Sequence, residues 1–471
     1  MPPPKPTAHD RHFTAKSFCG QWQIDTHHKI IEEYLALIFI ECGTSLRSEF
    51  ATGIQRVVRN IVYEAELVAP KLGHECVNVR FDGRGFELIA LKNTAQPATI
   101  GARIFAQGTT FYRKIKFLLP TIVHEYILKV VAAAQRLSQL TKDPQQIFKS
   151  HIRSYDARNQ IVGKHTKPIL LLLDSTWDMR VWKQVDEFKA TGGHVSAVLY
   201  DLIPFTHPET VEKHTRKAHT IWWSAAPLHL DSVICISKTV RKQFIEWQDT
   251  TPLARRISST HVDYFYLGSD LRNGANNSAD AVTNADSVNY GLFFLVVGSI
   301  EPRKNHTTIL DAFELLWLGD CPANLVIVGS HGWMSEDFLA RVMSHPMRAK
   351  RLFLLRRATD AQLALLYKDT LGLVIASVAE GFGLPIVEAF KHGTQVICSD
   401  IPVFREVAGE CAAYFEATNP ATLAAELLEI YRTPASQLKK GLPKAPAWLT
   451  WEESTSCLLG KLSEAQNAIQ Q

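Results

Sequence analysis

The sequence predicts two α/β domains, each built on a doubly wound parallel sheet, and three observations lead to this fold class. Short apolar runs alternate with amphipathic segments in both halves, which is typical of strands and helices in parallel sheets. Residues 271–289 are polar and poor in core formers, as expected of a linker. At 471 residues, the chain is also too long for one ordinary core.

The composition excludes several classes of protein. An apolar fraction of 46% and a charged fraction of 21% are typical of a soluble globular protein, and a net charge of +4 gives no case for a nucleic-acid binder. The eight cysteines are scattered without a Cys-x-x-Cys pair, which favours free thiols in a reducing compartment. The longest apolar runs are too short to span a bilayer. We expect a cytoplasmic protein, resting at most on the inner face of the cytoplasmic membrane.

The elements follow in order along the chain. After the first strand, a helix carries Ile54, Val57, Val58, Ile61 and Val62 on one face, and another helix begins at about Lys238. The strands expected in the first half are Tyr34–Ile40, Ile169–Leu173, Val195–Tyr200, Val233–Ile236 and Asp263–Leu267. Those expected in the second half are Phe293–Val297, Leu325–Val328, Leu352–Leu355, Leu373–Ile375 and Gln395–Cys398.

These elements define the expected domains. An N-terminal domain covers 1–270 and includes an atypical insertion at 84–168, while 271–289 is the linker and 290–440 the C-terminal domain. The last segment, 441–471, is expected to be helical and to pack back on the N-terminal domain. Within the insertion, basic and aromatic residues at 111–117 precede an amphipathic stretch. A core-facing helix is favoured there, with contact to an anionic membrane as the alternative.

Two glutamates mark the first candidate site. Glu380 and Glu388 flank Gly381-Phe382-Gly383-Leu384-Pro385, directly after an apolar strand. Glycines let backbone N–H groups approach a ligand, and a helix beginning near Pro385 would offer its positive end to an anion. Carboxylates beside such a site can accept hydrogen bonds from sugar hydroxyls. The segment therefore suits a sugar joined to a diphosphate, although a strand–turn–helix with two surface acids is the plainer alternative.

A second charged loop opens the same domain. Gly298 and Ser299 follow the strand at 293–297, and Arg303 and Lys304 stand just before Asn305, a good helix N-cap residue. Cations at the carboxyl end of a strand can neutralise a diphosphate. In doubly wound sheets such loops converge on one crevice. The two loops together favour a common binding site.

Residues 291–416 resemble the nucleotide-binding half of glycosyltransferase family 4, the retaining enzymes of GT-B fold. The resemblance is carried by Gly-Ser-Ile-Glu-Pro-Arg-Lys-Asn-His at 298–306, by Leu-Val-Ile-Val-Gly at 325–329, and by Glu-Gly-Phe-Gly-Leu-Pro-Ile-Val-Glu at 380–388. The N-terminal half is more weakly similar, through Thr-Gly-Ile-Gln-Arg at 52–56 and Tyr-Asp-Leu-Ile-Pro at 200–204. The resemblance implies two Rossmann-like domains that face a central cleft.

The resemblance also implies roles for individual residues. Lys304, with Arg303 as helper, would hold the donor diphosphate beside Gly298 and Ser299. Glu380 would bind hydroxyls of the transferred sugar, and Glu388 those of the ribose. The N–H groups of Phe382, Gly383 and Leu384, after Gly381, would meet phosphate or sugar, and Gly53 would let the N-terminal domain close on the diphosphate. Asp201 could orient sugar or acceptor, but could equally cap the turn before Pro204.

Three departures from the family pattern bear on these roles. Ser299 stands where many relatives have arginine, and Arg303 could supply that charge instead. Tyr200 replaces the histidine that is common before Asp201. In relatives the nucleobase strand often ends in glycine, and the matching place in this sequence is near Arg356. The resemblance therefore does not predict which nucleobase the donor carries.

The resemblance implies transfer of a sugar from a nucleotide diphosphate to an acceptor hydroxyl with retention of configuration. No Asp-x-Asp pair is present, so cationic side chains and helix N-termini rather than a metal would stabilise the leaving group. No cofactor is expected. The donor is expected to be GDP-mannose or a related GDP-sugar, and the acceptor a glycan or polyprenyl-linked glycan of surface polysaccharide or lipopolysaccharide synthesis, with peripheral membrane contact.

Other functions stay open on the sequence alone. A UDP- or dTDP-sugar could be the donor. The departures at Ser299, Tyr200 and Arg356 also leave room for a non-catalytic GT-B subunit that binds a partner transferase. The Glu-x7-Glu segment argues against a nucleotide-sugar epimerase, and the lack of a pyridoxal-binding lysine motif argues against a sugar phosphorylase.

Overall fold

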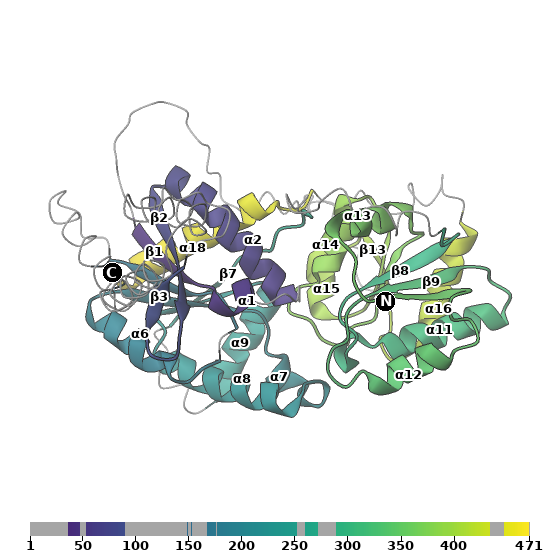
Figure 1. The fold of residues 1–471 in the computed structure, drawn as a ribbon, viewed down its shortest axis with the longest axis horizontal. Coiled ribbons are helices and arrows are strands. Elements are labelled where there is room, and N and C mark those ends of the chain that lie inside the picture. Colours follow the sequence, from purple (N-terminus) through teal and green to yellow (C-terminus); the bar gives the residue numbers. More distant parts are fainter. Residues whose placement is uncertain are drawn as a thin grey trace, which may run out of the picture.

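A computed structural model describes residues 36–47, 53–89, 148, 152, 167–175, 177–251, 260–271, 289–433 and 447–470. Two sheets organise these residues, one in each lobe of the molecule (Figure 1). Both sheets carry helices on their faces and consist of parallel strands, apart from one antiparallel edge strand in the first sheet. The predicted fold class of two doubly wound α/β domains is therefore confirmed.

The N-terminal sheet has seven strands in the order β3-β2-β1-β4-β5-β6-β7. The central strands β1, β4, β5 and β6 are buried along their whole length, because helices cover both faces. Its strands are β1 (Ala36–Glu41), β2 (His74–Phe81), β3 (Phe86–Leu88), β4 (Ile169–Leu172), β5 (His194–Leu199), β6 (Ser232–Cys235) and β7 (His261–Tyr264).

The helices of this domain follow the carboxyl ends of its strands. Helix α2 buries Val57, Val58, Ile61 and Val62 of the predicted apolar face, while Ile54 is partly buried. The helices are α1 (Gly43–Arg47), α2 (Gly53–Val68), η2 (Ala69–Leu72), α6 (Val181–Ala190), α7 (Ile203–Thr206), η4 (Pro208–Thr210), α8 (Lys213–Ala225), η5 (Ala226–Leu228) and α9 (Lys238–Thr250).

The C-terminal sheet has six strands in the order β10-β9-β8-β11-β12-β13, all parallel. They are β8 (Phe293–Val297), β9 (Asn324–Val328), β10 (Leu352–Leu355), β11 (Leu373–Ile375), β12 (Val396–Ser399) and β13 (Ala412–Phe415). The helices are η7 (Pro302–Lys304), α11 (His306–Leu318), α12 (Glu336–Ser344), α13 (Asp360–Asp369), α14 (Leu384–Lys391), α15 (Pro402–Ala408) and α16 (Pro420–Arg432).

Helix α18 (Trp451–Gln470) lies on the N-terminal domain beside α2, although it follows the C-terminal domain in sequence (Figure 1). Its first turn is anchored at Asp270, whose carboxylate accepts a hydrogen bond from the Trp451 N–H at 2.8 Å. Ser454 Oγ donates to the Tyr266 carbonyl at 2.7 Å. The chain therefore crosses between the domains a second time before it ends.

Several sequence-based expectations need correction or lie outside the description. The hairpin β2–β3 and strand β13 were not predicted, and the last N-terminal strand is β7 rather than Asp263–Leu267. Within the expected insertion at 84–168, residues 86–88 form the edge strand of the sheet. The stretch 111–138, most of that insertion and residues 272–288 of the expected linker lie outside the described residues. None of the described helices has the length and apolar character needed to cross a bilayer.

Candidate active site

The two predicted loops lie side by side because the strands before them are neighbours in the C-terminal sheet. Strand β8 leads to Gly298, Ser299 and η7, while β11 leads to Glu380 and then to α14. A backbone hydrogen bond of 2.9 Å from the Val378 N–H to the Arg303 carbonyl joins the loops. The structure thus brings Arg303, Lys304 and Glu380 into one cluster at the carboxyl ends of the strands, where doubly wound sheets bind ligands.

Glu380 is the centre of that cluster. Its Oε2 lies 2.5 Å from Arg303 Nη1, and its Oε1 accepts hydrogen bonds from Lys304 Nζ and, at 2.8 Å, from Ser377 Oγ. Burial alone would raise the pKa of Glu380, but the charges of Arg303 and Lys304 outweigh it and lower the pKa to about 2. The carboxylate is therefore ionised at neutral pH and fully engaged by the protein.

Arg303 is engaged on both sides, which bears on its predicted role as a helper to Lys304. Its Nη2 lies 2.5 Å from Glu301 Oε1, opposite the contact to Glu380, and Nη1 also donates to the Ala379 carbonyl at 3.1 Å. Two carboxylates therefore already neutralise Arg303, which leaves less of its charge for a diphosphate. In this arrangement Arg303 instead fixes Glu301 and Glu380 relative to one another.

Lys304 is the better placed cation for an anionic ligand. Among the described residues it has one carboxylate partner, Glu380, and its side chain runs past Gly298, where a Cβ would lie 3.6 Å from Lys304 Cε. Gly298 has a φ of 151°, a backbone conformation that favours glycine. Ser299, next to it, is half-buried.

Glu388 lies within helix α14 and is bound from two directions. Its Oε2 accepts a hydrogen bond of 2.8 Å from the buried hydroxyl of Tyr367, and its Oε1 lies 2.5 Å from Arg56 Nη1. Arg56 belongs to α2 of the N-terminal domain, and its Nη2 lies 2.8 Å from Asp360 Oδ1 at the start of α13. Glu388, which is predicted to bind the ribose, therefore takes part in an ion-pair network across the domain boundary.

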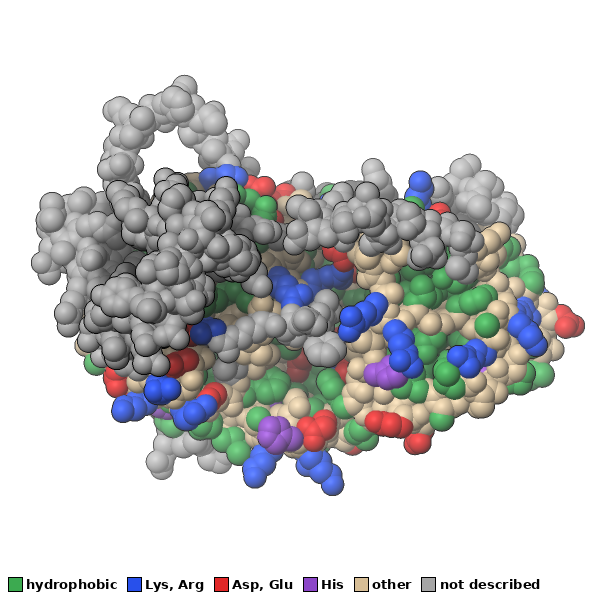
Figure 2. Space-filling model, viewed as in Figure 1, with side chains coloured by type: hydrophobic (Ala, Val, Ile, Leu, Met, Phe, Trp, Pro, Cys, Tyr) green, Lys and Arg blue, Asp and Glu red, His purple; other side chains and the backbone are tan. Residues whose placement is uncertain are grey.

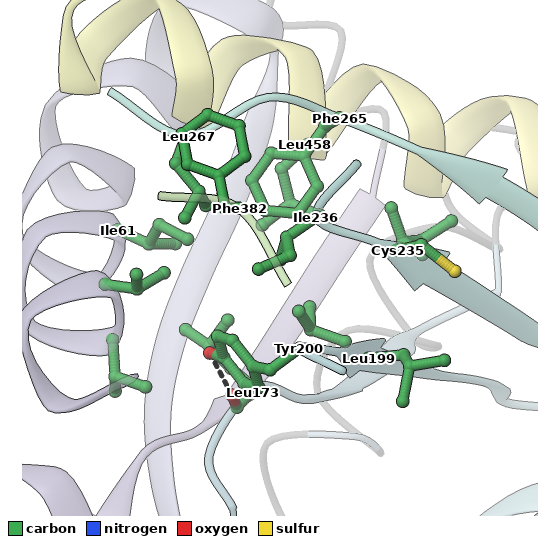
Figure 3. Packing of buried hydrophobic residues seen from close by; sticks show 14 of the residues in the cluster. Ile61, Leu173, Leu199, Tyr200, Cys235, Ile236, Phe265, Leu267, Phe382 and Leu458 are labelled. Atoms are coloured by element: carbon green, nitrogen blue, oxygen red, sulfur yellow. Dashed lines mark hydrogen bonds between the residues drawn. The ribbon is translucent and has the colours of Figure 1, made fainter. Parts of the chain in front are cut away.

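The glycine turn before α14 serves the domain contact as well as a ligand. A Cβ on Gly381 would lie 2.0 Å from the Tyr200 carbonyl oxygen, so glycine lets the two backbones touch. The Phe382 ring is buried against Tyr266 and Trp448, and Figure 3 shows it pointing among N-terminal-domain residues such as Leu267.

The N–H groups of this turn still fit their predicted role. Gly383 has a φ of 106° and forms the N-cap of α14, and Leu384 is the first residue of that helix. No described residue accepts a hydrogen bond from the N–H groups of Phe382, Gly383 or Leu384. Together with the helix N-terminus, these N–H groups form a place for an anion.

Asp201 and Tyr200 both bind groups of their own N-terminal domain. Asp201 Oδ1 accepts a hydrogen bond of 3.0 Å from the Ile203 N–H, so Asp201 does cap its turn. Burial raises the pKa of Asp201, while the charge of nearby Arg303 opposes that rise. The Tyr200 hydroxyl donates to the Leu173 carbonyl at 2.7 Å inside the N-terminal core (Figure 3), so it does not point toward the C-terminal domain.

Two further positions can now be placed. Gly53 is exposed at the start of α2, and a Cβ there would meet nothing within 4 Å, so the described residues do not require glycine. Arg356 is exposed after the edge strand β10.

A second set of domain contacts does not involve Arg56. Ser237 Oγ donates to the Gly381 carbonyl at 2.9 Å, and the Glu406 carboxylate accepts from the N–H groups of Lys238 and Thr239 at the start of α9. Basic side chains reach the surface where the two lobes meet (Figure 2). Glu406, Asp360 and the cross-domain role of Arg56 were not predicted, because nothing local in the sequence pairs segments so far apart.

Comparisons with known proteins agree with this geometry. Residues 286–441 match the family model described as "Glycosyl transferases group 1". Residues 286–441 therefore belong to the glycosyltransferases of that group, which confirms the predicted family. Among solved structures, the chain is similar to a sucrose-phosphate synthase from Thermosynechococcus elongatus, with a TM-score of 0.50 and 16% identity over 92% of this chain and 94% of that one. The fold is GT-B.

More similar sequences come from proteins named as mannosyltransferases. The chain is 34% identical over 288 residues to the "Serotype-specific mannosyltransferase WbdA" of Escherichia coli, covering 59% of this chain and 35% of that protein. It is 28% identical over 217 residues to the "O-antigen chain mannosyltransferase RfbU" of Salmonella typhimurium, covering 46% and 55%. The chain thus spans about a third of the length of WbdA.

Proposed function

We propose that the protein is a retaining, metal-independent glycosyltransferase that moves a sugar from a nucleotide-diphosphate donor to a hydroxyl of a glycan or polyprenyl-linked acceptor. The observation that carries the proposal is the cluster of Lys304 and Glu380 beside the free N–H groups at the start of α14. This cluster lies inside the segment that matches the glycosyltransferase family.

The chemistry follows from where charge develops. As the bond to the sugar breaks, negative charge grows on the leaving diphosphate, and cations and N–H groups aimed at it lower the barrier. Lys304 and the N–H groups of Gly383 and Leu384 are the groups proposed for this task. Glu380 would exchange its bond from Lys304 for hydroxyls of the transferred sugar, and the leaving phosphate would take the acceptor proton.

GDP-mannose is the proposed donor, because the similar proteins are named as mannosyltransferases. The proposed setting is the synthesis of a surface polysaccharide at the inner face of the cytoplasmic membrane. A panel of GDP-, UDP- and dTDP-sugars, with release of the nucleoside diphosphate measured in the presence of a polyprenyl-linked glycan, tests the donor. Release of GDP alone would support the proposal, and release of UDP or dTDP would replace GDP-mannose.

The rival function has one observation in its favour. Both Glu380 and Glu388 are fully engaged by protein groups, as a non-catalytic subunit with a closed site would have them. Thermal unfolding with each nucleoside diphosphate separates the two, since a ligand that binds the folded state raises the Tm. No shift with GDP, UDP or dTDP, together with no transfer, would favour the subunit.

Two further measurements test the rest of the proposal. Full transfer in EDTA would support a metal-independent reaction, and an unchanged anomeric configuration in the product would support retention.

A further inference from the structure

Arg56 joins the two domains at the carboxylate proposed to bind the donor ribose. It reaches from α2 to place Nη1 2.5 Å from Glu388 Oε1 and Nη2 2.8 Å from Asp360 Oδ1. A planar guanidinium suits two acceptors at once, so the pair of contacts fixes its position. One cation of the N-terminal domain thus binds two carboxylates of the C-terminal domain.

Burial decides what this contact does to Glu388. The Glu388 side chain is 3% exposed, so a sugar hydroxyl cannot reach the carboxylate unless a neighbour moves. Tyr367, on Oε2, is 0% exposed and packed in the core, whereas the Arg56 side chain is 25% exposed. Arg56 is therefore the neighbour that has to move.

We infer that Arg56 is a latch between the domains that competes with the donor ribose for Glu388. The inference rests on the proposed function, because it takes Glu388 as the ribose ligand. Donor binding releases Arg56 from Glu388, and the same linkage makes the latch lower the affinity for the donor. Asp360 is the second anchor of the latch and does not itself bind the nucleotide.

Other contacts keep the domains together when the latch opens. Ser237 Oγ binds the Gly381 carbonyl, and Glu406 caps the start of α9, and neither contact involves Glu388. The ring of Phe382 also stays packed against Tyr266 and Trp448. Loss of the Arg56 contact therefore changes ligand affinity rather than the integrity of the two-domain structure.

The direction of the change in GDP affinity distinguishes the latch from a simple loss of charge. Arg56→Gln removes a positive charge beside an anion site, which by itself weakens the binding of any diphosphate. The latch predicts the opposite for a ligand that carries ribose. By calorimetric titration, the Kd for GDP falls by about fivefold or more in Arg56→Gln. Inorganic pyrophosphate, which has no ribose, shows no such gain.

Two further variants control this result. Asp360→Asn weakens the latch without changing Glu388, so it gives a smaller gain in GDP affinity. Arg341→Gln is the matched control, because Arg341 also bridges two carboxylates, Asp311 and Glu314, but within the C-terminal domain. It leaves the Kd for GDP unchanged, and matching far-UV circular dichroism spectra show that the variants fold alike.

The outcomes separate this inference from the proposed function. If the wild type binds GDP and Arg56→Gln binds it equally or more weakly, the latch is wrong and the proposed function stands. If Arg56→Gln gains as much affinity for pyrophosphate as for GDP, Arg56 does not compete with ribose. If neither the wild type nor Arg56→Gln binds GDP, UDP or dTDP, the proposed donor site fails and the latch fails with it.

Discussion

The two buried glutamates of the site are neutralised in different ways. Glu380 meets Arg303 and Lys304, which come from a neighbouring loop of its own domain. Glu388 meets Tyr367 of its own domain and Arg56 of the other. The Glu380 cluster is therefore complete within the C-terminal domain, whereas the Glu388 cluster depends on how the domains sit together. The difference suggests a division between a preformed diphosphate–sugar site and a ribose site that the N-terminal domain controls.

Loss of Lys304 should have the largest effect. Lys304→Ala removes the cation proposed to stabilise the leaving diphosphate, and by comparison with other electrostatic stabilisers the rate of transfer should fall by about 10²–10³-fold. The assay is nucleoside-diphosphate release under saturating donor. Lys350→Ala, at an exposed lysine of the same domain, should leave the rate unchanged. A Lys304→Ala enzyme with normal turnover would remove Lys304 from the mechanism.

Acid unfolding should reveal how tightly the Glu380 cluster is held. The pKa of Glu380 is about 2 in the folded protein against an ordinary value of 4.5, so its stabilising effect is complete above pH 4.5. That effect is lost as the pH falls from 4.5 toward 2. In Glu380→Gln, the free energy of unfolding should depend less steeply on pH in this window. Equal slopes for the wild type and the variant would mean that the ion pairs do not form in solution.

Removing the Tyr367 hydroxyl should have a smaller effect at Glu388. Tyr367→Phe deletes a hydrogen bond to a buried carboxylate, and the free energy of unfolding should fall by about 1–3 kcal/mol. Tyr414→Phe is a matched control, because its hydroxyl donates to the neutral Gly409 carbonyl, and about 0.5–1.5 kcal/mol is expected. Urea unfolding of both variants measures the difference. A larger loss for Tyr414→Phe would contradict the expected strength of the hydrogen bond between Tyr367 and Glu388.

The contrast between the glutamates also shows what the sequence can predict. Strands β8, β10 and β11 have the predicted bounds, because each is an apolar run between turn signals. Strand β2, with the sequence His-Glu-Cys-Val-Asn-Val-Arg-Phe, mixes polar and apolar residues and carries no such signal. The proximity of Lys304 to Glu380 could be predicted, because both residues lie in loops that follow strands of one sheet.

Contacts between the domains could not be predicted in the same way. The bond from Arg56 to Glu388 joins residues 332 positions apart, and its geometry depends on how the domains pack. Likewise, the sequence predicts a ligand-binding role for Gly381, but it does not predict that this glycine accommodates the Tyr200 carbonyl. Residue types predict the chemistry of a loop, but the partner across a domain boundary is decided by tertiary structure.

The most direct test of the division between the glutamates compares the binding of GDP with that of GDP-mannose by calorimetric titration. Glu388→Gln should weaken the binding of both ligands by about tenfold, since both carry the ribose. Glu380→Gln should weaken GDP-mannose but not GDP, since only the sugar nucleotide presents the hydroxyls that Glu380 is proposed to bind. Unchanged GDP affinity in Glu388→Gln, or equal weakening of both ligands in Glu380→Gln, would contradict the account.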